Sequence, residues 1–375
     1  MSKEISYYSN RLLKKSFDSF CDKIAGYDGK IKSRDILEDR LKGIFECNKI
    51  ITTNTSTSAL HLALCAMDIK RGDKVICPVN SSIDTPQMVR HFDAEPLFID
   101  CLPRSYNIDT QKLEDLLKKS YTKKVRAVIL QHVAGMPSNI EAVMDIADRY
   151  NLVVIEDARE TFYAKVGCKY SNKRRSDMIV YSLGLKNREL FDGGVLIIDK
   201  YEWFDRAKLL KNSAIQKEKS KVDYIYDILD IGCQYDISEF DAQFALALLD
   251  NTKEETQRHK EIAQKYIQRL QNLKHVTLPI QSNKHTYYNF IIEIDKNRDS
   301  FAKALKDRGI QTWLSYVPLH LSKYYKEKYN LKVFDYPVAL SVYQKILLLP
   351  IDSHIEDEDI EYICEQIREV DEIHI

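Results

Sequence analysis

The chain has 375 residues, 44% of them hydrophobic and 30% charged, which is typical of a folded globular protein and not of a disordered one. Its 56 basic and 56 acidic side chains give a net charge of zero, so composition gives no support for nucleic-acid binding. The first residues lack the apolar core of a signal peptide, and no run reaches the roughly 18 apolar residues of a membrane span.

The eight cysteines contain no C-x-x-C pair, so we predict neither a zinc site nor any other metal site. Several of them, such as Cys65 and Cys77, lie inside apolar runs and are expected to be buried thiols. This pattern favours a protein of the reducing cytoplasm.

The N-terminal part of the chain predicts a helix and a strand that lead into a polar turn. Residues 33–47 carry apolar side chains at helical spacing, with Ser33 as the predicted N-cap. Residues 49–53 read as a strand, and 54–64 then pass from a polar turn directly into a helix. Such a helix start presents free N–H groups to an anion such as phosphate. The alternative is a plain helix cap.

Strands and helices alternate as far as residue 198. In the clearest helix, residues 138–150, Ser138 and Glu141 have the spacing of a capping box. The alternation predicts an α/β fold whose mostly parallel, seven-stranded sheet is covered on both faces. The predicted strands are 49–53, 75–78, 96–100, 126–132, 152–156, 178–182 and 194–198.

The pattern changes near residue 239, where a long helix begins. The remainder reads as strand, helix, a strand at 310–317, a further short strand and a final helix. We therefore predict a large domain over residues 1–245 and a small C-terminal α+β domain over 246–375.

Two of the predicted strands end in polar groups. One leads into Asp157 and the other ends at Ser182, with Lys186 four residues beyond. Ligands of open α/β sheets bind outside the carboxyl ends of the strands, so these groups are expected on one rim. An unprotonated lysine attacks an aldehyde, and a carboxylate keeps a pyridine nitrogen protonated. The set favours pyridoxal phosphate, with its phosphate held by hydroxyls such as Thr57 and Ser58.

Each of these residues also has a plain structural interpretation. An aspartate at a strand end often caps a turn, and a lone lysine usually lies on the surface. The pair Gly193–Gly194 would let the backbone pass close to the cofactor, or simply mark a turn. His132, on the same predicted rim, is expected to be a structural hydrogen-bonding residue.

The ordered motifs resemble those of a known family, the DegT/DnrJ/StrS pyridoxal-phosphate-dependent sugar-nucleotide aminotransferases. The resemblance covers residues 33 to 367 and implies the type I aminotransferase fold. The similar segments are STSALHLAL (56–64), GDKVICP (72–78), AEPLFIDC (94–101), HVAGMP (132–137), VVIEDARET (153–161), LGLKNRELFDGG (183–194), GIQTWLSYVPLH (309–320) and LLLPID (347–352).

The resemblance implies a role for each residue of the rim. Lys186 would bond to the cofactor aldehyde and later move a proton between carbon atoms, while Asp157 would pair with the pyridine nitrogen. Glu160 would lie near the ring hydroxyl. Active sites would be shared across a homodimer. The implied contacts to the phosphate are Thr57, Ser58, Ser182 and, from the partner subunit, Gln234.

The resemblance also implies the reaction. L-glutamate would convert the cofactor to its pyridoxamine form, and the amine would then pass to a nucleotide-linked keto sugar for surface polysaccharide or glycan biosynthesis. Glu160 also occurs in members that aminate C4, so it favours a 4-keto-6-deoxy sugar. Substrate contacts are assigned to Ser82, Tyr316 and His320. The alternatives are a sugar dehydratase with the same cofactor, which Lys186 disfavours, and a non-catalytic member that binds a sugar nucleotide or a protein.

The chain departs from the usual family pattern at two places near the ligands. Ser82 stands where an aromatic side chain commonly stacks on the cofactor ring, a contact typically worth about 1 kcal/mol. Gln234–Asp236 stands where Asn-Tyr-Arg is usual, which reverses a charge near an anionic substrate.

Overall fold

The computed structural model describes residues 4–7, 14–26, 32–161, 176–184, 191–217 and 225–373. Lys186, the predicted catalytic lysine, lies outside these residues. No helix within the described ranges is both long and apolar enough to cross a membrane.

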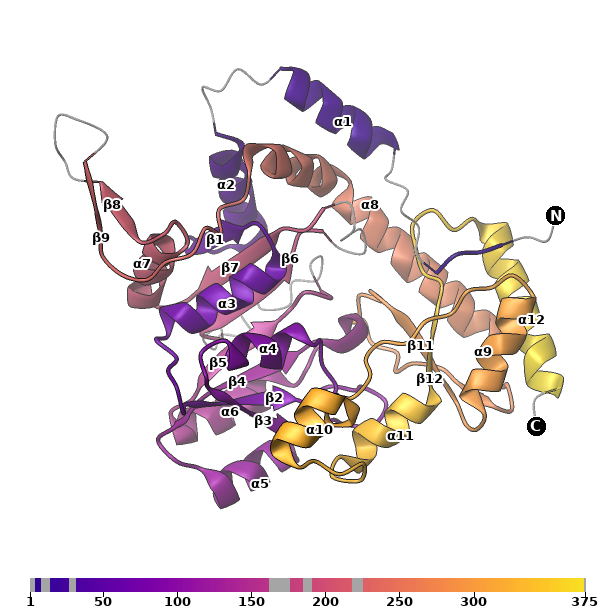
Figure 1. The fold of residues 1–375 in the computed structure, drawn as a ribbon. Helices are drawn as coiled ribbons and strands as arrows, with labels where there is room; N and C mark the ends of the chain where they lie inside the picture. Colours follow the sequence, from indigo (N-terminus) through magenta and orange to yellow (C-terminus); the bar gives the residue numbers. More distant parts are fainter. Residues whose placement is uncertain are drawn as a thin grey trace.

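A seven-stranded sheet forms the centre of the large domain, in the order β1-β7-β6-β5-β4-β2-β3 (Figure 1). β7 is antiparallel to both of its neighbours, and all other neighbouring strands are parallel. The seven predicted strands and their mostly parallel arrangement are confirmed. They are β1 (Ile50–Thr53), β2 (Lys74–Pro78), β3 (Glu95–Ile99), β4 (Val125–Gln131), β5 (Val153–Asp157), β6 (Met178–Ser182) and β7 (Gly194–Ile198).

Helices cover both faces of this sheet, which is why its strands are apolar on both sides. α3 (Ser56–Ala66), α4 (Asp84–Arg90) and α7 (Tyr201–Leu210) pack on the face that includes Val75 and Ile129. The opposite face is covered by α1 (Lys14–Ala25), α2 (Ser33–Phe45), α5 (Thr110–Ser120), α6 (Ile140–Tyr150) and the first half of α8 (Glu239–Arg269).

Two of the predicted helix caps are wrong, because the hydroxyl and amide groups concerned have tertiary partners. Ser33 is the first residue of α2, and its N–H donates to Glu239 of α8 at 2.6 Å. Ser138 donates its hydroxyl to the Gln131 carbonyl, and Asn139 caps α6 instead. The helices themselves lie where they were predicted.

α8 carries the chain into the small domain (Figure 1). Its first half packs with the large sheet, while its second half joins the small-domain core. The predicted boundary at residue 245 therefore falls inside one helix and stays a prediction. The small domain contains β10 (Val276–Thr277), β11 (Phe290–Ile294), β12 (Ile346–Leu349), α9 (Arg298–Asp307) and α12 (Asp357–Ile373).

The predicted strand at 310–317 is wrong. Its middle makes only an isolated bridge from Trp313 to Leu348, beside β12. Ile310, at its start, pairs with Ile5, so residues 4–7 lie against the small domain, although the predicted division placed them in the large one.

One part of the C-terminal region packs on the large domain, next to β2 and β3 (Figure 1). The Leu319 N–H donates to the carbonyl of Val79, just after β2, at 2.9 Å. Asp100, which follows β3 and is buried, accepts from the N–H groups of Val338 and Ala339. This region comprises η2 (Leu319–Leu321), α10 (Lys323–Tyr329) and α11 (Pro337–Lys345).

The remaining elements are a short 3-10 helix and a two-stranded hairpin. The short 3-10 helix η1 (Val133–Gly135) follows β4 on the carboxyl rim of the sheet. The hairpin of β8 (Ile215–Lys217) and β9 (Tyr226–Ile228) projects from the molecule beside α7 (Figure 1).

Replacing Asp100 by Ala is expected to lower the free energy of unfolding by about 3 kcal/mol. The change removes a buried carboxylate that caps α11 and also pairs with Lys112 at 2.7 Å. Lys112→Met is the matched control. It should cost about 1 kcal/mol or less, because Lys112 is partly exposed and Asp100 keeps its amide donors. Guanidinium unfolding measures both, and equal losses would contradict the capping role.

Candidate active site

The carboxyl ends of β1, β2, β4, β5 and β6 share one edge of the sheet, because the reversed β7 leaves β1 running parallel to the others. Buried polar atoms nearly always have hydrogen-bond partners. Among the described residues, several buried polar atoms at this edge have none. These are Asn54 Oδ1, Ser56 Oγ, both amide atoms of Asn80, Thr85 Oγ1, Gln131 Oε1 and Ser182 Oγ. The rim therefore has the capacity to hold a polar ligand.

The start of α3 and the end of β6 meet at one place on this rim. Thr53, Gly194 and Ser182 are neighbours across β1, β7 and β6. α3 begins three residues after Thr53, and its half-buried Thr57 and Ser58 lie in the first turn. The structure thus brings the three predicted phosphate ligands to the same part of the rim.

The predicted plain cap of α3 is also present. The Thr55 side chain accepts from the Ser58 N–H at 2.9 Å, and the two hydroxyls lie 2.8 Å apart. Gly194 makes this turn possible, because a Cβ there would lie 2.3 Å from both Thr53 Oγ1 and the Thr55 carbonyl oxygen. Gly194 therefore closely approaches the chain's own β1–α3 turn, and the predicted approach of Gly193–Gly194 to the cofactor stays a prediction.

Asp157 lies at the end of β5, is 1% exposed and is bound by a buried guanidinium. Arg159 Nε and Nη2 donate to its Oδ1 and Oδ2, each at 2.7 Å. Arg159 Nη1 donates to Asp84 at 2.8 Å. Burial alone would lower the pKa of Arg159, but the charge and hydrogen bonds of Asp157, together with the charge of Asp84, raise it. Arg159 therefore stays a cation between two carboxylates.

Asp157 retains room for one further donor. Its Oδ1 accepts from Arg159 Nε and, at 3.3 Å, from the Arg159 N–H. Its Oδ2 accepts from Arg159 Nη2 alone among the described residues. Since a carboxylate oxygen has two lone pairs, Oδ2 can accept one more hydrogen bond, as from a protonated ring nitrogen.

Glu160 joins the rim to the small domain. Its carboxylate accepts from the Ala134 N–H at 2.5 Å and from the Tyr316 hydroxyl at 2.8 Å. Gln131 donates to the same tyrosine oxygen at 3.3 Å. Burial, followed by the charge of Glu160, raises the pKa of Tyr316 well above its ordinary value, so its hydroxyl keeps its proton.

The turn that presents the Ala134 N–H has an unusual backbone. Ala134 and Gly135 have φ values of 57° and 86°. A Cβ at Gly135 would lie 2.0 Å from Thr286 Oγ1 of the small domain, so this position requires glycine. Left-handed backbone at a non-glycine residue is costly and often marks a functional site.

His132 is a structural residue, in line with the prediction from sequence. Its Nδ1 accepts from the Ser138 N–H at 3.0 Å, so the ring proton is on Nε2. Nε2 donates to Glu156 at 2.9 Å, and both side chains are fully buried. Glu156 precedes Asp157 on β5 and therefore faces the other side of the sheet.

The predicted substrate residues lie at different positions around the rim. Ser82 is half-buried and donates to Asp84 at 3.1 Å. His320 is buried and donates to the Val333 carbonyl at 3.1 Å, while no described residue bonds to its Nδ1. Burial lowers the pKa of His320. Of the three, Tyr316 contacts another predicted site residue, because its hydroxyl donates to Glu160.

The segment expected to reach the partner subunit lies beyond β9. Gln234 is exposed and bridges to Asn212. Asp236, which reverses a charge of the usual pattern, pairs with Arg34 at 3.3 Å and with Lys211 at 3.1 Å. Its negative charge is therefore matched locally by two cations.

Asp84 and Arg159 were not identified from the sequence as site residues. They lie 75 positions apart, and no local spacing links them. The one available signal was the arginine of EDARET, a charged residue two positions after a strand-end carboxylate.

Comparison with known proteins gives the family. The model of the DegT/DnrJ/EryC1/StrS aminotransferase family matches residues 30–368. The chain belongs to this family. Membership confirms the resemblance and the predicted enzyme class, a pyridoxal-phosphate-dependent sugar aminotransferase.

Two curated relatives illustrate the similarity of this aminotransferase. The chain is 28% identical over 321 residues to a GDP-perosamine synthase of Escherichia coli O157:H7, covering 85% of this chain and 84% of the relative. It is 27% identical over 335 residues to the spore coat polysaccharide biosynthesis protein SpsC of Bacillus subtilis, covering 85% of each.

A solved structure supports the fold. PseC of Helicobacter pylori, an aminotransferase involved in the biosynthesis of pseudoaminic acid, matches with a TM-score of 0.85 and 19% identity. The match covers 99% of this chain and 100% of that one. The predicted type I aminotransferase fold is thereby confirmed.

The residues present in this aminotransferase fit the family's cofactor. The buried Ser182 hydroxyl has no hydrogen-bond partner among the described residues and lies near the start of α3, as a phosphate site requires. Asp157 keeps an acceptor position for a ring N–H. Both features belong to the same rim.

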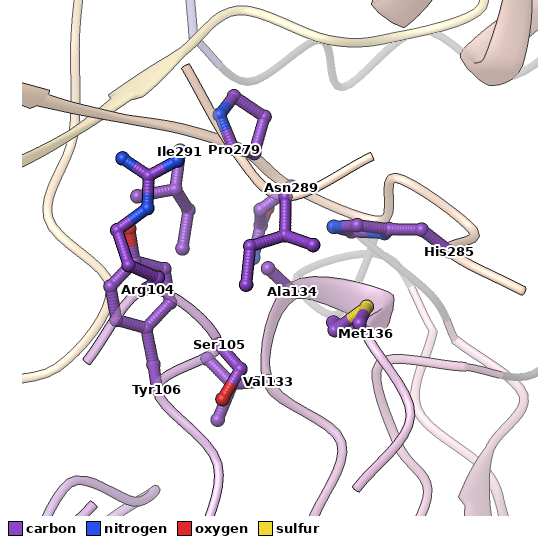
Figure 2. Close-up of a pocket in the computed structure, with 11 residues that line it drawn as sticks. Arg104, Ser105, Tyr106, Val133, Ala134, Met136, Pro279, His285, Asn289 and Ile291 are labelled. Carbon is purple, nitrogen blue, oxygen red and sulfur yellow. The ribbon is translucent and has the colours of Figure 1, made fainter. Parts of the chain in front are cut away.

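A small, partly open pocket lies between the two domains of the aminotransferase (Figure 2). It borders the rim, because Val133 and Ala134 line one side of it, with His285 and Asn289 of the small domain opposite. His285 is 4% exposed, stacks on Tyr287 and accepts the N–H of that residue through Nδ1. Burial lowers the pKa of His285 to about 4.

The aminotransferase is expected to lose stability as the pH falls from about 6.5 to about 4. In that window the unfolded chain protonates His285 while the folded chain does not, at a cost of up to about 3 kcal/mol. His61, whose pKa burial also lowers to about 4, adds in the same direction. His285→Asn should make the free energy of unfolding fall less steeply between these pH values. Identical slopes in wild type and variant would contradict the assignment.

Proposed function

We propose that this aminotransferase moves an amino group from L-glutamate to the ketone of a nucleotide-linked sugar, with a 4-keto-6-deoxy sugar favoured. The amino sugar would enter surface polysaccharide or glycan biosynthesis, and the reaction would take place in the cytoplasm. The main support is the convergence on one rim of Asp157, Glu160, Ser182 and the start of α3. The names of the two relatives, a synthase of a GDP-linked sugar and a polysaccharide biosynthesis protein, agree with this class of substrate.

The proposed binding roles follow from the contacts on the rim. Thr57, Ser58 and Ser182 hold the phosphate, and Asp157 accepts a hydrogen bond from the ring nitrogen. Glu160 lies near the ring hydroxyl, held in place by the Ala134 N–H and by Tyr316.

Lys186 is proposed as the catalytic residue. The described chain leaves β6 at Ser182 and returns to β7 at Gly194, and these two residues are paired on the rim. Lys186 lies between these two residues in the sequence. With the cofactor bound, its amine would be the group that reacts with the aldehyde and would then carry the proton between carbon atoms.

The chemistry divides between the cofactor and the chain. The protonated pyridine ring supplies an electron sink for the electron pair that remains when a C–H bond next to nitrogen breaks. Asp157 keeps the ring nitrogen protonated, and Lys186 carries the proton. Over both half-reactions glutamate becomes 2-oxoglutarate, and the sugar C=O becomes C–NH₂.

The substrate side of the site is assigned to residues from both domains. Tyr316 and Ser82 line the proposed approach to the ring, because each is bonded to a rim carboxylate, Glu160 or Asp84. His320, with its unpartnered Nδ1, is the third proposed contact.

A homodimer is proposed to complete each site. Exposed apolar side chains gather just before, on and after β9, where they would be covered by a second copy of the chain. Gln234 follows this patch and is exposed, so in the dimer Gln234 of the partner subunit would reach the cofactor phosphate. The patch comprises Ile225, Tyr226, Ile228, Leu229 and Ile231.

The protein purified with pyridoxal phosphate is expected to show a visible absorption band that bleaches when L-glutamate is added. Lys186→Ala should lack that band, because the amine that bonds to the aldehyde is gone. The matched control is Lys200→Ala, a change at an exposed lysine beside Trp203 that should leave the spectrum unchanged.

The other outcomes of this experiment separate the competing functions. An unchanged band in Lys186→Ala would contradict the lysine assignment. A band in wild type that no amino donor bleaches would favour a non-catalytic member that binds a sugar nucleotide. If glutamate bleaches the band, nucleotide-linked keto sugars should restore it, and a 4-keto-6-deoxy sugar should do so fastest.

A further inference from the structure

We propose that Gln131 is a further substrate-binding residue, whose amide oxygen accepts a hydrogen bond from the sugar hydroxyl on the carbon next to the ketone. The proposal rests on the nucleotide-linked keto sugar put forward under Proposed function. It adds to that function the group of the sugar that the site recognises.

Gln131 is the last residue of β4 and lies beside Asp157 on the rim. The two residues are paired in the register of β4 and β5. Paired residues of neighbouring strands project their side chains from the same face of the sheet, and such strands lie about 4.8 Å apart. Ile129 and Ile155, two positions earlier on each strand, share the core of that face. A ligand held at Asp157 is therefore within reach of Gln131.

Tyr316 determines the orientation of the Gln131 amide. The Tyr316 hydroxyl donates its proton to Glu160 at 2.8 Å, and burial, followed by the charge of Glu160, raises the pKa of that hydroxyl. Its oxygen can therefore only accept from Gln131, which it does at 3.3 Å. The amide nitrogen thus faces Tyr316, and the amide oxygen occupies the other branch of the side chain.

The amide oxygen of Gln131 is buried and needs a donor. The side chain belongs to a residue that is 4% exposed, and none of the described residues donates to Oε1. Buried polar side-chain atoms usually have at least one hydrogen-bond partner, and leaving one unsatisfied is costly. The rim therefore contains a fixed acceptor position that a ligand can fill.

The sugar is the component of the proposed reaction that supplies a suitable donor. The ring N–H of the cofactor is assigned to Asp157 and its ring hydroxyl to Glu160. The carboxylates of glutamate are acceptors and cannot donate to an amide oxygen, whereas sugar hydroxyls can. Because the ketone has to approach the ring, the hydroxyl on the adjacent carbon is the one expected nearest to Gln131.

The test compares two sugars on the nucleotide that wild type uses best, a 4-keto-6-deoxyhexose and the 4-keto-3,6-dideoxyhexose that lacks this hydroxyl. The measured quantity is kcat/KM of the second half-reaction, followed as the return of the visible band after glutamate has bleached it. Wild type is compared with Gln131→Met, which removes the acceptor, and Gln131→Glu, which keeps one. Gln243→Met is the matched control, because Gln243 is also buried but donates to Ser33 at 2.8 Å between α2 and α8.

Wild type is expected to use the dideoxy sugar about tenfold to a hundredfold less efficiently, because that sugar leaves Oε1 unpaired. In Gln131→Met the two sugars should differ by less than about threefold, while Gln131→Glu and Gln243→Met should keep a preference of at least about tenfold. The rate at which glutamate bleaches the band should change by less than about threefold in Gln131→Met, since glutamate does not use this acceptor.

Two results would overturn the proposal. The first is a wild type that uses both sugars equally well, which indicates that the donor to Oε1 belongs to the protein itself. The second is a Gln131→Met variant that prefers the hydroxylated sugar as strongly as wild type does. The first result requires wild type alone, so the proposal can be contradicted even if Gln131→Met does not fold.

Failure of the proposed function gives a different result from failure of this proposal. If glutamate bleaches the band and no nucleotide-linked keto sugar restores it, the substrate class is wrong and the role of Gln131 is wrong with it. If both sugars restore the band equally well, only the role of Gln131 is wrong.

Discussion

The central constraint on this structure is a sheet that is buried on both faces. Helices cover each side, so a polar side chain within the strands has to find a partner inside the protein, as Glu156 does with His132. Polar groups free to meet a ligand are therefore confined to the strand ends. The reversed β7 adds the end of β1 to the same edge, and with it the start of α3. The site follows from this arrangement.

Several charged side chains lie at this rim with little access to water. Asp157 and Glu160 lie three residues apart, but they are stabilised in different ways. Asp157 faces a permanent cation that is itself shared with Asp84, whereas Glu160 is held by an amide and a tyrosine hydroxyl. The two carboxylates can therefore respond to different parts of a ligand, one to positive charge and the other to hydrogen-bond donors.

Most of the strands could be predicted because they contain three or more consecutive apolar residues, and that signal is local. The positions of Asp157 and Ser182 at the ends of two strands could also be predicted from the sequence. The incorrect or missed predictions concern residues whose partners are distant in the sequence. Ser33 has the local sequence of an N-cap. In the structure, however, its N–H donates to Glu239, which lies 206 positions away in the chain. The segment 310–317 has strand-like residues, yet only Trp313 pairs with β12. Asp84 meets Arg159 only because β2 and β5 place them on one rim.

α8 fixes the relative position of the two domains through its length. It is one helix of 31 residues whose halves belong to different cores. Inserting or deleting one residue in its middle would rotate the far half by about 100° and shift it by about 1.5 Å. That screw motion would separate Tyr316 from Glu160 and Thr286 from Gly135, although no site residue had changed. The geometry of the site therefore depends on the number of residues in this helix as well as on the site residues themselves.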